Sequence, residues 1–127
     1  MHKSRLAGFI IDCKTDDLEQ AASFWSAALG FSLAPRAEDA SPDKYRELHT
    51  GPNGLHVEVQ RVEHESRVHL DIETDDIEAE ARRLEALGAR RIEQVHTWLV
   101  MEAPTGQRFC IVRPQRSDFA AGANQWP

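Results

Sequence analysis

Apolar residues recur at the three- and four-residue spacing of a helix face in two segments, residues 16–29 and 75–87. Each segment opens with a pair of aspartates, which can cap the free N–H groups of a first helical turn. Each is followed by a glycine, Gly30 or Gly88, of the kind that ends helices. We therefore predict one helix in each segment.

The two predicted helices belong to a longer internal repeat. DDLEQAASFWSAALG in the first half of the chain matches DDIEAEARRLEALG in the second, and GPNGLHVEV matches APTGQRFCIV. Strand-like runs flank both helices and give each half the order of one strand, one helix and three strands. The predicted strands span residues 8–14, 31–36, 44–50 and 55–62 in the first module and 67–73, 89–96, 97–102 and 108–113 in the second.

The repeat predicts a single domain over residues 8–113, built from two βαβββ modules at about residues 8–62 and 67–113. Strands and helices mixed in this way indicate the α+β class. Residues 114–127 show no periodicity. We expect them to form a C-terminal tail that either frays or packs its two aromatic residues on a partner subunit.

Alternation within two neighbouring predicted strands gives the sheet one apolar and one polar face. The apolar face, which we expect to pack on helices, is formed by Leu55, Val57, Val59, Val68, Leu70 and Ile72. The polar face is formed by His56, Glu58, Gln60, His69, Asp71 and Glu73. A polar face on an antiparallel sheet is most often solvated. The alternative is that the sheet curls and this face lines a cup, in which carboxylates and imidazoles converge on a ligand or a metal.

Length and charge argue against several classes of protein. The 127 residues suffice for one domain, and 15 basic against 21 acidic residues give a net charge of −6, which argues against general nucleic-acid binding. No apolar run approaches the roughly 20 residues that span a bilayer, and no secretory leader opens the sequence. We therefore expect a cytoplasmic protein without a membrane partner. Two cysteines, Cys13 and Cys110, are too few for a disulfide framework.

These motifs resemble those of the vicinal oxygen chelate superfamily, and most closely its glyoxalase-like subgroup (glyoxalase, bleomycin resistance protein, dioxygenase). The resemblance rests on the FW-containing first helix, the strand VHLD and the final strand PTGQRFC, and covers residues 8–113. It implies that the two modules form a curved, barrel-like mixed sheet with the helices outside. It also implies a small-molecule ligand and a homodimer, and it leaves the reaction open because this fold hosts many chemistries.

In metal-dependent members of the superfamily, the first and last strands of each module supply the ligands, commonly a histidine and then a glutamate. The resemblance places the ligand positions at Ile10, Glu58, His69 and Cys110. Cys110 is either a thiolate ligand, with His56 or Asp12 beside it, or, as we favour, a small apolar filler. Because two ligands hold a metal weakly, we expect no tightly bound transition metal. The cofactor is unknown, and a divalent metal is the less favoured alternative.

Without a metal, the resemblance makes His69 and Glu58 the candidate catalytic pair, with His69 as general base and Glu58 as the carboxylate that orients it. We expect these two side chains to approach each other across adjoining strands. The candidate ligand-binding residues are His56, Asp71, Trp98, Tyr45 and Cys110. The two aromatic rings among them are candidate walls for a planar or apolar ligand.

Three functions agree with these features. The first is a glyoxalase-like small-molecule-binding protein that acts as a lyase or isomerase on a small oxygenated substrate. The second is a non-catalytic protein that sequesters a small molecule, and the third is an interaction module derived from an enzyme. The sequence has no glycine-rich phosphate loop, nucleophile elbow or HExxH motif, which argues against nucleotide hydrolysis, serine hydrolysis and metalloproteolysis. Whether the protein is an enzyme stays open.

Overall fold

The computed structural model describes residues 1–35 and 44–127. In this part of the chain, the first module contains β1 (His2–Lys14), α1 (Leu18–Leu29), β2 (Ser32–Leu33), β3 (Tyr45–His49) and β4 (His56–Val62). The second contains β5 (Arg67–Thr74), α2 (Ile77–Ala86), β6 (Arg90–Val95), β7 (Trp98–Glu102) and β8 (Arg108–Val112), and is followed by α3 (Phe119–Gly122) and β9 (Asn124–Trp126). Both modules have the order βαβββ, which confirms the predicted α+β class. Position 36 of the second predicted strand lies outside the described residues.

Aspartate caps set the starts of both main helices. The Asp17 carboxylate accepts the N–H of Gln20, and the Asp76 carboxylate accepts the N–H of Ala79, at 3.1 and 3.0 Å. Helix α1 ends at Gly30, whose φ of 77° lies in the left-handed region that glycine tolerates. The two predicted helices are therefore confirmed. Among the described residues, no helix is both long and apolar enough to cross a membrane.

The residues Phe9–Val68 form one compact unit, which we call the first-module unit. Its strands lie in the order β2-β3-β4-β1. The antiparallel register of β3 and β4 pairs Glu47 with Glu58 and Leu48 with Val57. Since neighbouring residues of a strand point to opposite faces, Leu48 and Val57 enter the core while the two glutamates share the other face.

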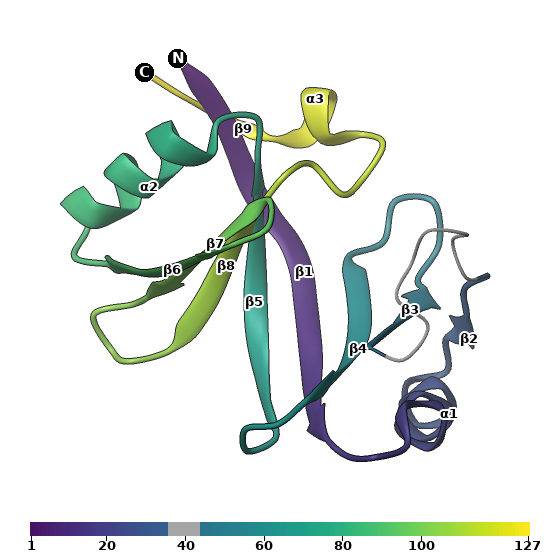
Figure 1. Cartoon of the computed structure of the whole chain (residues 1–127). Helices are drawn as coiled ribbons and strands as arrows, with labels where there is room; N and C mark the ends of the chain where they lie inside the picture. Colours follow the sequence, from purple (N-terminus) through teal and green to yellow (C-terminus); the bar gives the residue numbers. More distant parts are fainter. Residues whose placement is uncertain (36–43) are drawn as a thin grey trace. The chain divides into compact units, whose positions relative to one another are not determined.

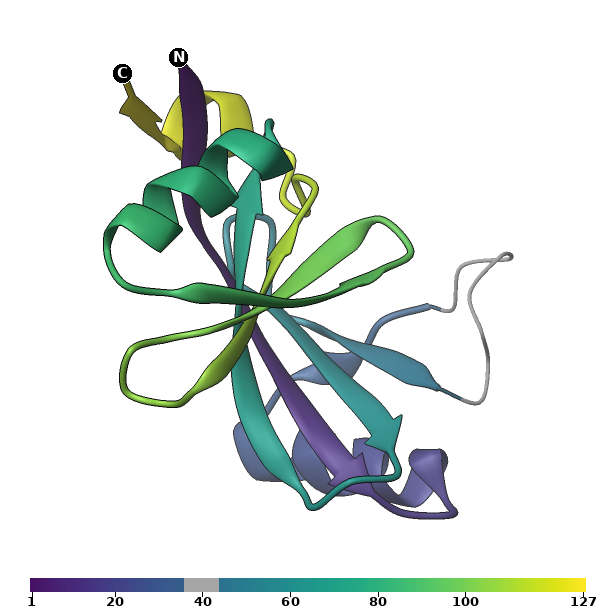
Figure 2. The ribbon, with the colours of Figure 1, turned by 60° about the vertical axis from the view of Figure 1, so that its left-hand side comes forward.

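The remaining residues, Met1–Gly8 and His69–Pro127, form the second-module unit. Its strands lie in the order β1-β5-β8-β7-β6, with β5 and β8 parallel and the β6–β7 and β7–β8 pairs antiparallel. Helix α2 lies along the β6–β8 side of this sheet, as two views show (Figures 1 and 2). Its core consists of Ala81, Leu84, Leu99, Met101 and Ile111.

The predicted apolar face is wrong along the first half of β5. Val68 and Leu70 are 59% and 53% exposed, whereas Asp71 on the polar side is only 7% exposed and Glu73 is fully buried. Helix α2 covers only the later part of the strand. The core beneath this helix includes Ile72 but not Val68 or Leu70. The polar side of β5 is thus the one withdrawn from solvent.

The residues after position 113 pack on their own unit and do not fray. Strand β9 pairs antiparallel with the start of β1, with His2 opposite Trp126, and lies beside it in Figure 1. Phe119 is buried, and the Trp126 indole donates a hydrogen bond to Ser4 Oγ at 2.8 Å. This pairing also explains why β1 starts at His2 and not at residue 8. The two aromatic residues assigned to a partner subunit therefore have contacts within the chain.

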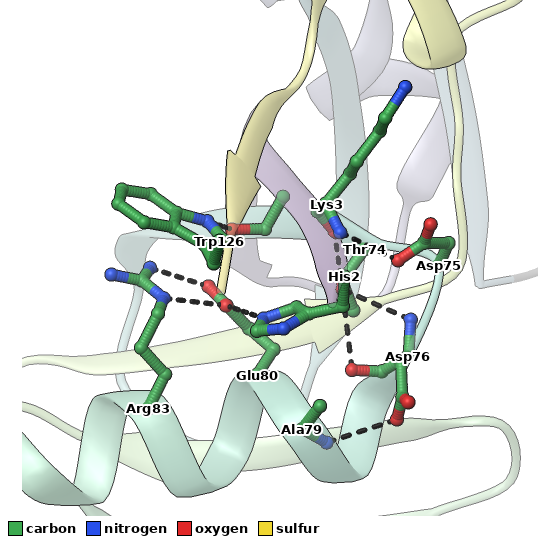
Figure 3. A network of polar contacts seen from close by, with 10 residues as sticks. His2, Lys3, Thr74, Asp75, Asp76, Ala79, Glu80, Arg83 and Trp126 are labelled. Carbon is green, nitrogen blue, oxygen red and sulfur yellow. Dashed lines mark hydrogen bonds and ion pairs between the residues drawn. The ribbon is translucent and has the colours of Figure 1, made fainter.

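A buried carboxylate joins helix α2 to both ends of the described chain (Figure 3). Arg83 donates two hydrogen bonds of 2.8 Å to Glu80, and His2 Nε2 lies 2.8 Å from Glu80 Oε1. The Arg83 guanidinium in turn lies 4.0 Å from the ring centre of Trp126, within cation–π range. Burial alone would raise the pKa of Glu80, but the hydrogen bonds from Arg83 and His2 hold it below its ordinary value.

Candidate functional site

The second-module unit brings together three of the predicted site residues, His69, Asp71 and Cys110. His69 and Asp71 lie two residues apart on β5 and so share one face, and the parallel register places Cys110 of β8 directly beside Asp71. One potential ligand atom from each of the three lies within 4.8 Å of the others. We call these residues the second-module group.

The carboxylate of Asp71 is buried and incompletely satisfied. Its Oδ1 has no hydrogen-bond partner within the described part of the chain, although it lies 3.3 Å from His69 Nε2. An unsatisfied buried polar atom costs on the order of 1–3 kcal/mol, and more when it is charged. Such an atom in a folded protein calls for an explanation, and a ligand is one.

Cys110 also has apolar neighbours. Cys110 packs in a cluster with Ala7 and Val112, and Trp98 and Val100 cover this cluster. The ring of Trp98 also lies 5.6 Å from that of His96. The structure therefore places the predicted aromatic wall, Trp98, beside Cys110, so that apolar and polar surfaces adjoin in the second-module unit.

The first-module unit brings together Glu47, His56 and Glu58, which we call the first-module group. His56 Nε2 lies 3.1 Å from Glu58 Oε2, and His56 Nδ1 lies 3.9 Å from Glu47 Oε1. Tyr45 lies on the same face, where its hydroxyl accepts a 3.3 Å hydrogen bond from Gln60. The imidazole of His56 is thus placed to interact with two carboxylates from neighbouring strands.

The sequence analysis missed Glu47. This residue joins the group because the β3–β4 register sets it directly opposite Glu58. The register depends on the connection between the strands, and the alternation within one strand does not reveal it. The two groups contain or adjoin all seven predicted site residues. Asp71, two residues further along β5, lies within ion-pair distance of His69, at 3.3 Å. The predicted approach of Glu58 to His69 stays a prediction.

The ligand set of the metal-dependent superfamily members does not fit this chain. Ile10 stands at the first of the four positions, is 5% exposed and carries only an aliphatic side chain. At the fourth position Cys110 replaces a carboxylate. A set that draws a histidine and a glutamate from each module is therefore incomplete here, and no reaction step is assigned to a metal held by it.

Comparison with known proteins agrees with this architecture. Residues 8–112 match the model of the glyoxalase-like domain family. A hypothetical protein from Bacillus halodurans C-125 is similar in structure, with a TM-score of 0.62, 12% identity, and coverage of 90% of this chain and 96% of that one. No curated protein matches the sequence.

Two further solved structures share the fold. A variant of methylmalonyl-CoA epimerase from Streptomyces coelicolor, in complex with 2-nitronate-propionyl-CoA, has a TM-score of 0.53 and 17% identity over 89% of this chain and 97% of that one. A glyoxalase/bleomycin resistance protein/dioxygenase superfamily member from Vibrio splendidus 12B01 has a TM-score of 0.53 and 18% identity over 87% and 99%. Identities this low speak for the fold alone. With the family model matching most of its length, the chain belongs to the glyoxalase-like domain family.

Proposed function

We propose that this protein binds a small oxygenated molecule and that the side chains of His69 and Asp71 form the polar part of its binding site. The observation that carries the proposal is the buried Oδ1 of Asp71, which has no hydrogen-bond partner in the described chain. A ligand hydroxyl would satisfy this atom. The apolar cluster around Cys110 would contact the carbon part of the same ligand.

The same pair suits proton transfer, which supports a lyase or isomerase. A carboxylate beside an imidazole fixes its tautomer and stabilises the imidazolium, so His69 would accept a proton from a carbon next to a carbonyl. Asp71 Oδ1 lies 3.3 Å from His69 Nε2 and would act as a positioning residue for the ring. We keep Glu58 as the second proposed catalytic group, with His56 at 3.1 Å as its neighbour.

Sequestration without reaction is the second candidate function. It is favoured by the aliphatic Ile10 at a position where metal-dependent members carry a ligand, since binding needs no metal-activated oxygen. In this case His69 and Asp71 donate and accept hydrogen bonds, and no proton leaves the ligand. We also propose that the protein works as a cytoplasmic homodimer, which sedimentation of the purified protein and fractionation of expressing cells would test.

A panel of small 2-oxo and 2-hydroxy acids and ketones, followed by protein NMR, tests the proposal. We expect shifts at His69 and Asp71, and loss of binding in His69→Ala but not in His64→Ala, an exposed histidine whose Nδ1 lies 2.8 Å from the backbone oxygen of Glu65. Deuterium exchange at the bound ligand's α-carbon then separates the two functions, because only a proton-transfer enzyme catalyses it. Binding that His69→Ala leaves intact would contradict the proposed site.

A further inference from the structure

We propose that the site formed by His69 and Asp71 selects ligands that carry a protonated amine, and that this amine binds at Asp71 Oδ1. The inference rests on the proposed function and deepens it, because it names the chemical class of the ligand. A ligand hydroxyl at Oδ1 would supply a hydrogen bond but would leave the negative charge of the buried carboxylate uncompensated. An ammonium group supplies both the hydrogen bond and the charge.

The carboxylate of Asp71 is buried without an arginine or a lysine beside it. Asp71 is 7% exposed, and its Oδ1 makes no hydrogen bond within the described part of the chain. Among the same residues, no arginine or lysine forms an ion pair with it, and its ion-pair neighbour is His69. Since a buried charge is ordinarily paired, this carboxylate calls for a positive charge that the described arginines and lysines do not supply.

Two other acids of the second-module unit show how this unit otherwise compensates a buried charge. Glu73, which follows Asp71 by two residues on β5, is fully buried and lies 2.7 Å from Arg5. Glu80 on α2 is also fully buried and lies 2.8 Å from Arg83. Both acids thus have a guanidinium at hydrogen-bond distance. Asp71 differs from them in this respect, although it comes from the same strand as Glu73.

The neighbours of Asp71 add no lasting positive charge. His69 Nε2 lies 3.3 Å from Oδ1, but a general base is neutral before it accepts a proton, so the imidazole does not compensate the carboxylate in the state that binds substrate. Cys110, beside Asp71 in the ladder, packs with Ala7 and Val112, which suit a short carbon chain. The inferred ligand class is therefore a small amino alcohol or amino ketone.

Three ligands that differ only in the charge of one end test the inference. Isopropanolamine, propylene glycol and lactate share a three-carbon body with a hydroxyl on the middle carbon, and end in a cationic, a neutral and an anionic group. Each is titrated into the full-length protein at neutral pH and followed by NMR. Isopropanolamine should bind roughly five- to ten-fold more tightly than propylene glycol, because charge-assisted hydrogen bonds are about twice as strong as neutral ones. Lactate should bind most weakly, because its carboxylate is repelled by Asp71.

Two variants with the same change of net charge locate the effect. Asp71→Asn keeps the shape of the side chain and removes its charge, so isopropanolamine should lose its advantage over propylene glycol. Glu93→Gln, the matched control, removes one charge from an exposed acid on β6 and should keep that advantage. If Asp71→Asn does not fold, the carbon-13 shift of the Asp71 carboxyl group in the wild type replaces it as the measurement. This shift should move with isopropanolamine and not with propylene glycol.

The outcomes separate this inference from the proposed function. Binding of propylene glycol or lactate that is as tight as that of isopropanolamine, and that His69→Ala abolishes, would overturn the inference and leave the proposed function standing. Loss of the preference in Glu93→Gln would also overturn it, since net charge and not Asp71 would then be the cause. Absence of binding by all three ligands and by the 2-oxo and 2-hydroxy panel would contradict the inference and the proposed function together.

Discussion

The two glutamates of the first-module group stand partly in solvent, whereas Asp71 and Cys110 of the second-module group are buried. Glu58 and Glu47 have side chains 21% and 52% exposed, and water can satisfy their oxygens that His56 does not reach. Asp71 has no such access, and its Oδ1 lacks a hydrogen bond among the described residues. Strands β3 and β4 on one side and β5 on the other thus carry carboxylates in opposite situations.

Burial therefore distinguishes the two groups more clearly than residue type does. Both contain a histidine two residues from an acid on one strand, with a third polar residue across the ladder. Of the two groups, only the second-module group contains a buried oxygen, Asp71 Oδ1, that lacks a hydrogen bond among the described residues. The free energy cost of burying this atom is therefore not compensated within the unit. A ligand or ion that binds there recovers this penalty, so we place the function there first.

The largest expected effect concerns Glu73, a satisfied buried acid on the same strand as Asp71. Its carboxylate accepts hydrogen bonds from Arg5 at 2.7 Å and from Arg116 at 3.1 Å. Glu73→Gln removes the buried charge between the two guanidiniums, so that Arg116 loses its ion pair and Arg5 keeps only Asp118. Urea unfolding should therefore show a loss of about 3–5 kcal/mol. Glu58→Gln is the solvated control, and an equal loss there would remove the contrast between the units.

The pH dependence of the free energy of unfolding should reveal the contribution of Glu73. Burial would raise the pKa of Glu73, but N–H groups of Gln115, Arg5 and Arg116 outweigh it and lower the pKa below its ordinary value. A lowered pKa adds stability that is complete above the unfolded-state pKa, about 4.3, and is lost as the pH falls through the folded-state value. Lowering the pH from about 5 to about 3 should therefore reduce the free energy of unfolding more in the wild type than in Glu73→Gln. Parallel profiles would contradict this.

Asp71 should respond in the opposite direction to Glu73. In metal-free protein, Asp71→Leu replaces an unsatisfied carboxylate with an apolar group of similar shape, so the free energy of unfolding should rise by about 1–3 kcal/mol. The partly exposed control, Glu58→Leu, should change it by less than about 0.5 kcal/mol. A loss of stability in Asp71→Leu would mean that the carboxylate has a stabilising partner when the protein is free of ligand.

The sequence was sufficient for the repeat and the two helices, because aspartate caps, terminal glycines and apolar spacing are local signals. It was not sufficient for the start of β1 at His2, which depends on a partner strand at the opposite end of the chain. The exposure of Leu70 was missed for a similar reason, since it is set by where α2 ends on the sheet. Residue types therefore suggested the site, but burial and register decided which acid lies beside which base.

The smallest expected effect concerns the opposed pair in the first-module group. Glu47 and Glu58 face each other across the β3–β4 ladder, and like charges directly opposite destabilise a sheet by roughly 0.2–1 kcal/mol. Glu47→Gln removes this repulsion but also weakens the contact with His56, which is 3.9 Å away and therefore contributes little. Urea unfolding should therefore show a free energy of unfolding higher by a few tenths of a kcal/mol. This gain should vanish when Glu58→Gln is already present. A loss of stability in Glu47→Gln would mean that the three side chains are coupled tightly enough to form a site of their own, and the second-module group would then no longer stand alone.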